Sequence, residues 1–419
     1  MPVCIPNAKL LSYTADIIRA GGIKPSFQPI VALKSRSILG FEALARGNDG
    51  NGPVSPLELF ARAREEGAVL DLDRECRRVA LEEFARSFSG AKALLFLNIE
   101  SSIVDMGSVG SGFLMAQCAR AGVSPAQVVL EIVETNVRDE GLLVDFVRTH
   151  RNLGFTIAID DMGEGHSNLN RIALIKPDII KADRALSRDL SRDYMKQRIV
   201  SSLAGLSRNI GALFLLEGIE TEDDALEAFR LGTDLYQGYF FARPGETSKE
   251  AIITLERRLV SVASSARDAA IRALARRTQV IERCFAEMEP VVRDLRLRDD
   301  NGFDAALAGY RGLIDRCECL FVLDERGIQV SDTALQADYP PVSRFPAIFG
   351  PAARGYDHSV KDYFYFASSA NRRFVSDPYI SFSSGIPCFT VTIPFTLRKG
   401  HRRRYLCADF CESRLPRSP

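Results

Sequence analysis

The chain has 419 residues, of which 46% are hydrophobic and 26% are charged, and its formal net charge is zero. These proportions exclude disordered and fibrous classes, and the length predicts two or three domains. The balanced charge also argues against binding to duplex nucleic acid, which depends on clustered Lys and Arg.

The nine cysteines are scattered without a CxxC framework, which predicts a reduced, cytoplasmic protein. The pairs Cys317/Cys319 and Cys407/Cys411 lack zinc spacing and accompanying histidines, so no zinc site is predicted. The N-terminus has no basic region followed by an apolar stretch, and no apolar run reaches the about 18 residues of a membrane span. We therefore expect neither secretion nor a membrane-spanning segment.

Between Lys24 and Pro244, short apolar segments alternate with longer amphipathic ones, a pattern typical of parallel strands covered by helices. About eight strands are expected, the number that closes a TIM-like (β/α)8 barrel. The first two are too close in sequence for an intervening helix, so they should form an antiparallel hairpin. The predicted strands are 25–32, 38–45, 93–99, 128–132, 156–160, 179–181, 212–217 and 235–239.

Acidic, amide and basic side chains follow the apolar stretches of these strands. Because the carboxyl ends of the strands in a β/α barrel share one rim, we expect these side chains to meet in one site. Carboxylate and amide oxygens are ligands for hard divalent cations, so the predicted chemistry is metal-assisted. The residues are Glu42, Asn98, Glu131, Asp160, Asp161, Lys181, Glu217 and Gln237.

The composition divides the chain into a barrel at 1–247, a helical linker at 248–299 and a small α+β domain at 300–419. In the linker, apolar residues from Leu255 to Ala273 recur at spacings of four and three, like a short coiled-coil seam. This helix either lies against its own two domains or acts as a dimerising, signal-transmitting element. The last domain should be built on an antiparallel sheet, with strands at 320–323, 328–330, 374–380, 388–393 and 405–410.

The tripeptide Glu42-Ala43-Leu44 resembles the signature of the EAL family of cyclic di-GMP phosphodiesterases. The resemblance extends from Lys24 to Pro244. Further motifs stand in the family's order at 27–31, 98, 130–135, 160–163, 178–183, 217–220 and 237–244.

The resemblance implies two magnesium or manganese ions. Glu42, Asn98, Glu131 and Asp160 would hold one ion, and Asp160 would bridge to a second ion that Asp161 also holds. Two such ions clamp a phosphodiester and activate a shared water. The residues implied in catalysis are Glu42, Asp160, Lys181, which would position the water, and Glu217, which would act as base or as a further metal-site contact.

The resemblance also implies how the substrate and a nearby loop are held. Gln28, Leu44, Arg46 and Gln237 would bind cyclic di-GMP, with Arg46 on the non-reacting phosphate. The product would be linear pGpG, and the protein would be a homodimer. Glu134 would anchor the loop after Asp161 through Ser167, and Glu220 would cap or brace the site.

That loop departs from the family pattern at Met162, Glu164 and His166. Met162 exchanges one apolar side chain for another. Glu164 adds a negative charge that repels substrate, adds a ligand or points to solvent, and His166 takes an aromatic position. These changes put the turnover rate in question more than substrate binding.

In the C-terminal domain, the segments 357–364, 375–381 and 385–391 resemble a PAS-like Cache sensory domain. The resemblance implies an unknown small ligand or a protein partner, and Tyr363, Tyr379 and Asp409 are the candidate ligand-binding residues. The alternatives are that these three side chains pack a half-buried sheet and that the domain only dimerises.

Two functions compete. One is an active cyclic di-GMP phosphodiesterase regulated by its C-terminal domain, favoured by the full ligand set. The other is a receptor that binds cyclic di-GMP without useful turnover and signals through a partner, favoured by the divergence at Glu164 and His166. A purely structural scaffold would not require the strand-end acids and Lys181 together.

Overall fold

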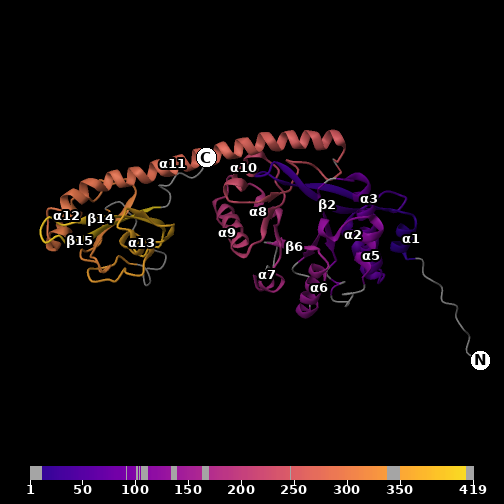
Figure 1. The fold of residues 1–419 in the computed structure, drawn as a ribbon, viewed down its shortest axis with the longest axis horizontal. Coiled ribbons are helices and arrows are strands. Elements are labelled where there is room, and N and C mark those ends of the chain that lie inside the picture. Colours follow the sequence, from indigo (N-terminus) through magenta and orange to yellow (C-terminus); the bar gives the residue numbers. More distant parts are fainter. Residues whose placement is uncertain are drawn as a thin grey trace, which may run out of the picture. The chain divides into compact units, whose positions relative to one another are not determined.

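In the computed structural model the chain divides into two compact units, 1–269 and 270–419. The structure describes residues 12–90, 92–100, 102, 104, 112–133, 139–162, 169–245, 247–336 and 350–411. Figure 1 shows the elements of both units in chain order, coloured from indigo to yellow.

The first unit is a closed eight-stranded barrel with a short additional strand, β3 (Pro53–Val54), on β2. β1 and β2 pair as an antiparallel hairpin, as predicted, and β1 also runs antiparallel to β9, whereas the pairs from β2–β4 to β8–β9 are parallel. The barrel strands are β1 (Ile23–Ala32), β2 (Ser37–Asn48), β4 (Leu94–Ile99), β5 (Val128–Val133), β6 (Thr156–Met162), β7 (Ile179–Ala182), β8 (Leu213–Leu216) and β9 (Leu235–Tyr236).

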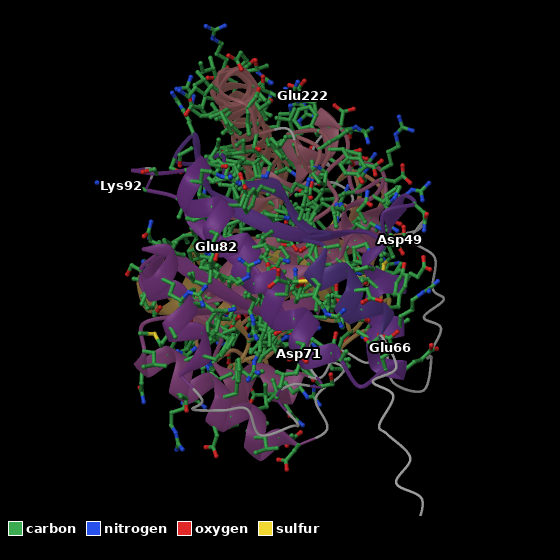
Figure 2. The ribbon with its side chains drawn as sticks, turned by 90° about the vertical axis from the view of Figure 1, so that its right-hand side faces the viewer. Asp49, Glu66, Asp71, Glu82, Lys92 and Glu222 are labelled. Carbon is green, nitrogen blue, oxygen red and sulfur yellow. The ribbon has the colours of Figure 1, made fainter. Side chains whose placement is uncertain are left out.

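Helices surround these strands (Figure 1), and side-chain caps fix where several of them begin. Ser55, Asp139, Asp193 and Thr221 each accept a backbone N–H of the first turn, which satisfies donors that have no partner within the helix. The helices of this unit are α1 (Tyr13–Arg19), α2 (Pro56–Glu65), α3 (Val69–Ser87), α5 (Phe113–Ala121), α6 (Glu140–Asn152), α7 (Leu169–Ile175), α8 (Arg184–Ser187), α9 (Tyr194–Ile210) and α10 (Glu222–Arg230). Figure 2 shows labelled charged side chains, among them Glu82, Lys92 and Glu222, on the outer surface.

A small apolar cluster fills the inside of the barrel. It takes one residue from each of seven strands, and β2 contributes Gly40 at the corresponding level. A Cβ on Gly40 would come within 2.3 Å of the Leu94 carbonyl oxygen, so only glycine fits where β2 approaches β4. The seven cluster residues are Ile30, Phe96, Val129, Ala158, Ile179, Leu215 and Leu235.

A single helix, α11 (Lys249–Leu295), occupies the range where a helical linker was expected. Leu255, Leu259 and Val262 from the proposed coiled-coil seam are buried in the core of the barrel unit. Further along the helix, Met288 and Val291 are buried in the core of the second unit. The first part of the proposed seam thus packs within this chain, as the first interpretation of the linker expects, and the dimerising role stays a prediction.

The second unit is built on an antiparallel sheet in the order β11-β10-β15-β14-β12, with β13 paired to β14. Two strand predictions are corrected. Residues 328–330 form only isolated bridges, and the segment 374–380 is split into two short strands around Pro378, which has no N–H for a ladder. The elements are η3 (Asp300–Gly302), α12 (Phe303–Ala308), β10 (Cys317–Leu323), β11 (Ala334–Leu335), α13 (Asp362–Ala370), β12 (Phe374–Val375), β13 (Tyr379–Ile380), β14 (Pro387–Thr396) and β15 (Arg403–Cys411).

The remaining expectations concern cysteines and membrane association. Eight cysteines lie in the described part of the chain, and none of them forms a disulfide there. None of the helices described is both long and apolar enough to cross a bilayer.

Candidate active site

Seven of the eight predicted strand-end residues, all but Asp161, form one polar layer with Gln28 directly above the apolar cluster of the barrel. On each strand the polar residue stands two positions from the apolar one, toward the same rim, so the two side chains share the inner face. β1 runs in the opposite direction, and there the polar residue precedes the apolar one. The layer consists of Gln28, Glu42, Asn98, Glu131, Asp160, Lys181, Glu217 and Gln237.

Glu42 is the centre of a hydrogen-bonded chain of amides. It is 6% exposed, its Oε1 accepts a hydrogen bond from Asn98 Nδ2 at 2.9 Å, and its Oε2 accepts one from Gln237 Nε2 at 2.7 Å. Gln237 Nε2 also lies 3.2 Å from Gln28 Oε1, and Gln28 Nε2 donates to the Ala242 carbonyl oxygen at 3.1 Å. The chain fixes the orientation of the Glu42 carboxylate and leaves the Asn98 amide oxygen outside these bonds.

Lys181 is the centre of the charged half of the layer. Its side chain is 1% exposed, and its Nζ lies 2.6 Å from Glu131 Oε1, 2.6 Å from Glu217 Oε1 and 3.0 Å from Asp160 Oδ2. Burial opposes the charged ammonium, but the surrounding carboxylates outweigh it and hold the pKa of Lys181 well above its ordinary value. The lysine is therefore a permanent cation within the cluster.

Two of the carboxyl groups around Lys181 have raised pKa values, because their charged form is disfavoured. Burial, with the charges of Glu42 and Asp160, raises the pKa of Glu131 well above its ordinary value, although Lys181 opposes the shift. Burial likewise raises the pKa of Glu217 to about 8. Burial is the largest cause of both shifts, and the neighbouring carboxylates add to it because a single ammonium cannot compensate four of them. The site carries an excess of negative charge that a cation or protons must neutralise.

Asp160 and Asp161 lie at an irregularity in β6, where its register with β7 shifts between Ile159 and Met162. Asp161 has a φ of 60°, in the left-handed region that aspartate tolerates better than most residues. Its backbone N–H donates to Asp160 Oδ1 at 2.9 Å. The bulge therefore presents two consecutive aspartates at the rim.

The donor set fits a hard divalent cation in its chemistry. All predicted ligands are carboxylate or amide oxygens, and both carboxylate oxygens of Glu131 are buried without a well-aligned hydrogen bond. Within the described residues, however, no three acidic, imidazole or thiol side chains stand together at the spacing of a metal centre. The Lys181 ammonium lies among the carboxylates, so the ligands would have to close around an ion.

A cavity of about 230 Å³ adjoins this layer and is lined by Leu44, Arg46 and Asn98. The Arg46 guanidinium donates to the Ala45 carbonyl oxygen at 2.8 Å, and no carboxylate of the described residues pairs with it. The cavity is also lined by Asp73 and Arg77, a buried ion pair on α3 that the motif analysis did not predict. The sequence did contain a sign of this pair, because an acid and an arginine stand four residues apart on an otherwise apolar face of the helix.

Three further predictions for this site have different outcomes. Glu134 and Ser167 lie outside the described residues, as do Glu164 and His166. Glu220 is exposed, and no hydrogen bond or ion pair of the described residues joins its side chain to the polar layer. Its bracing role has no support from the described contacts.

In the second unit, the three candidate sensory residues lie in one buried network. Tyr379 OH lies 2.7 Å from Thr390 Oγ1 and 3.3 Å from Asp409 Oδ1, and the rings of Tyr363 and Tyr379 stack at 6.1 Å. Tyr363 OH in turn lies 2.6 Å from His358 Nδ1. The tyrosine hydroxyls thus have partners within the protein, as the packing interpretation expects.

The fold and the site together define a β/α-barrel protein with an oxygen-rich, lysine-centred site at the carboxyl ends of its strands. Residues 12–244 match the model of the EAL domain, and the chain belongs to the EAL-domain family.

Among curated relatives, the chain is 28% identical over 324 residues to the uncharacterized EAL-domain containing protein YkuI of Bacillus subtilis, an alignment that covers 75% of this chain and 78% of YkuI. It is 27% identical over 257 residues to the cyclic di-GMP phosphodiesterase RocR of Pseudomonas aeruginosa, covering 58% of this chain and 63% of RocR. The crystal structure of YkuI in complex with substrate c-di-GMP and calcium is similar to this chain with a TM-score of 0.79 at 26% identity, covering 96% of this chain and 98% of that one.

Proposed function

We propose that this protein hydrolyses cyclic di-GMP to linear pGpG with the help of divalent cations. The observation that carries the proposal is the Lys181 ammonium within 3.0 Å of three carboxylates, beside the Asn98–Glu42–Gln237 chain. RocR is by name a cyclic di-GMP phosphodiesterase, and YkuI was crystallised with c-di-GMP and calcium. Both relatives support the same substrate for this chain.

Magnesium or manganese, two ions in all, would be held by the predicted ligands. Glu42, Asn98, Glu131 and Asp160 would hold one ion, and Asp160 with Asp161 would hold the other. When bound, such ions neutralise phosphodiester charge and lower the pKa of a shared water. The excess negative charge around Lys181 supports this assignment, because divalent cations would neutralise what a single ammonium cannot.

Lys181 would stabilise negative charge in the reaction, and Glu217 would act as the base. The three N–H groups of Lys181 face carboxylates from β5, β6 and the end of β8. Once cations hold Glu131 and Asp160, the freed N–H groups would donate to the attacking water and to the developing charge on phosphate. Glu217 would accept a water proton at its carboxylate, which bound cations would keep ionised against the burial that raises its pKa to about 8. The water oxygen bonds to phosphorus, one ester P–O bond breaks, and the leaving oxygen takes up the proton that Glu217 removed from the water and departs as an alcohol.

The dinucleotide would lie across the rim and into the adjoining cavity. Arg46, whose guanidinium has no carboxylate partner among the described residues, would pair with the non-reacting phosphate. Leu44 would line the cavity beside it. Gln28 and Gln237 would hold the substrate from the opposite side of Glu42.

The test is hydrolysis of cyclic di-GMP by the full-length protein in magnesium or manganese, with pGpG followed chromatographically. Glu42→Gln keeps the shape of the side chain and removes its charge, so we expect turnover to fall by at least a hundredfold. A titration with cyclic di-GMP in calcium measures binding separately. Tight binding without turnover in either metal would contradict the enzyme and favour the receptor, which the sequence changes at Glu164 and His166 support.

Three further parts of the proposal concern the whole protein. We infer a cytoplasmic homodimer whose C-terminal domain regulates hydrolysis. Light scattering tests the dimer. The Tyr379→Phe variant, which removes a hydroxyl bonded near Asp409, tests regulation, because a change in hydrolysis rate would have to be transmitted from the second unit.

A further inference from the structure

The second unit contains a concavity of about 840 Å³ with arginines on several sides. Two come from the end of α11 and just beyond it, one follows β14, and one begins β15. All four are exposed. They are Arg293, Arg296, Arg398 and Arg403.

None of the four has a carboxylate within 4.0 Å among the described residues, although carboxylates are near in sequence. Asp294 pairs with Arg298, and Asp300 pairs with Arg404 at 2.8 Å and Arg402 at 3.6 Å. The same hairpin therefore carries paired and unpaired arginines. The alternation of β15 explains the difference, because Arg404 is buried on one face while Arg403 is exposed on the other.

Helix electrostatics account for only part of this cluster. Cations near the C-terminal end of a helix complement its dipole, which suffices for Arg293 and Arg296. It does not explain Arg398 and Arg403, which belong to the hairpin. The hairpin is tied to the helix end by the Arg398 N–H, which donates to the Arg296 carbonyl oxygen at 3.0 Å. Like charges from separate elements are thus held together.

The framework around the arginines is packed against the core of the second unit and is partly apolar. Phe395 and Leu397 are each 2% exposed, which anchors the end of β14 and the turn that carries Arg398. Leu297, at 60% exposure, and Pro394 add apolar surface to the concavity. An anchored concavity with four cations and an apolar wall is suited to a compact anion of high charge.

We propose that this concavity, the arginine pocket, binds a small soluble anion with several phosphate groups, such as a nucleoside triphosphate or inorganic tripolyphosphate. Guanidinium groups bind phosphate oxygens in pairs of parallel hydrogen bonds, which favours phosphate over a single carboxylate. The volume exceeds that of one phosphate, and four cations match the charge of a triphosphate. The concave shape favours a compact ligand over an extended membrane surface.

The test is titration calorimetry of the full-length protein with tripolyphosphate and with GTP at about 0.15 M salt, where weak surface attraction is screened. In Arg398→Gln/Arg403→Gln we expect at least tenfold weaker binding of both. The matched control is Arg402→Gln/Arg326→Gln, which removes the same charge from exposed arginines outside the pocket and should change affinity less than twofold. Unfolding temperatures of both variants verify that they fold.

The comparison between ligands defines what is recognised. Equal affinities identify the phosphate chain, whereas tighter binding of GTP identifies contact between the nucleoside and the Leu297 wall. Both support the pocket.

Three outcomes overturn it. These are no binding of either phosphate, equal losses in the two double variants, or binding only to phosphatidylglycerol vesicles. None of them depends on hydrolysis of cyclic di-GMP, so the pocket and the proposed function fail independently.

Discussion

The Lys181 ammonium lies 2.6 Å from Oε1 of Glu131, a carboxylate with no exposed surface. The two side chains come from β7 and β5 on the inner face of the barrel, and both are buried. Attraction between buried charges is strong, but each charge also loses its hydration, so such a pair contributes less net stability than its short distance indicates. Removing only one partner of such a pair costs the most stability, because it leaves the other charge buried without compensation.

We therefore predict that Lys181→Met destabilises the barrel unit by about 3 kcal/mol, because Glu131, Asp160 and Glu217 lose their common cation. Urea unfolding at pH 8 in a chelator measures the loss. The loss should shrink at pH 5, where the freed carboxyl groups can take up protons. Added magnesium or manganese should restore part of it, because the ion replaces the missing positive charge.

Lys92→Met is the matched control. Lys92 is exposed on the outer surface of the barrel unit (Figure 2), so its removal should change the free energy of unfolding by less than about 0.5 kcal/mol. A Lys181→Met protein as stable as this control at pH 8 would contradict the account of the cluster.

Gly218 follows Glu217 directly and has a φ of +68°. A Cβ at this position would lie 2.2 Å from the Cβ of Arg184 and 2.9 Å from its Cα. Gly218→Ala should therefore cost more than about 2 kcal/mol, since it combines backbone strain with a clash against α8. It should also lower hydrolysis, because relief of the clash displaces Glu217.

Gly211→Ala separates strain from clash. Gly211 has a φ of +80°, and nothing lies within 4 Å of a Cβ there, so only the strain of about 1 kcal/mol remains. Thermal unfolding compares the two variants. Equal shifts in unfolding temperature would show that the contact with Arg184 does not matter.

The layered arrangement explains why the barrel could be predicted from the sequence. In seven of the eight barrel strands a buried apolar residue and a polar residue stand two positions apart, and Gly40 takes the apolar place in β2; an alternating strand must place both on one face. That rule locates Glu42, Glu131 and Gln237 without any knowledge of side-chain conformation. It does not state which atoms meet, so the Asn98–Glu42–Gln237 chain and the position of Lys181 appear only in the structure.

Other features of the structure could not be predicted from the alternation of strand residues. The ion pair of Asp73 and Arg77 lies on a helix that contributes no motif, and it reaches the cavity only because α3 packs beside β1 and β4. In the second unit, Pro378 interrupts a segment whose composition otherwise favours one strand. The hydroxyl contacts of Tyr363 and Tyr379 depend on how separate segments of the second unit pack together, which the periodicity of a single segment does not specify.

The buried pair Asp73 and Arg77 should show strong coupling. Their side chains are 3% and 9% exposed, and Asp73 Oδ1 also accepts the Glu100 N–H at 3.2 Å. Arg77→Met leaves Asp73 buried beside the cavity without its cation, so we expect a loss of about 3 kcal/mol. Asp73→Asn/Arg77→Met should recover about 2 kcal/mol of that loss, because no uncompensated charge remains.

Urea unfolding of the wild type, both single variants and the double variant gives the coupling energy directly. Additive losses would mean that the two side chains act independently and that the ion pair has no role in stability. Arg64 is exposed and pairs with Glu100 at 3.2 Å, so Arg64→Met is a control for which a change below about 1 kcal/mol is expected.

In the second unit, Glu318 on β10 is a fully buried acid with no cation beside it in the described residues. Its Oε1 accepts a hydrogen bond from Ser381 Oγ at 2.5 Å, and its Oε2 has no hydrogen-bond partner among the groups described. Burial, assisted by the charge of Asp409, raises the pKa of Glu318 to about 7. The folded protein therefore favours the neutral carboxyl group.

The sign of the pH effect follows from that shift. The folded pKa lies above the unfolded value, which is near 4.5, so the neutral group contributes stability fully below pH 4.5 and loses it as the pH rises toward 7. Glu318→Gln stays neutral at every pH. It should match the wild type at pH 5 and be more stable at pH 8 by on the order of 2 kcal/mol.

Calorimetric scans of the full-length protein from pH 5 to pH 8 would follow the difference. A residual slope near pH 6 is expected in both proteins from Asp409, whose pKa burial raises to about 6. A variant that is equally destabilised at pH 5 and pH 8 would show that the hydrogen bond to Ser381, and not the buried charge, determines the effect of Glu318.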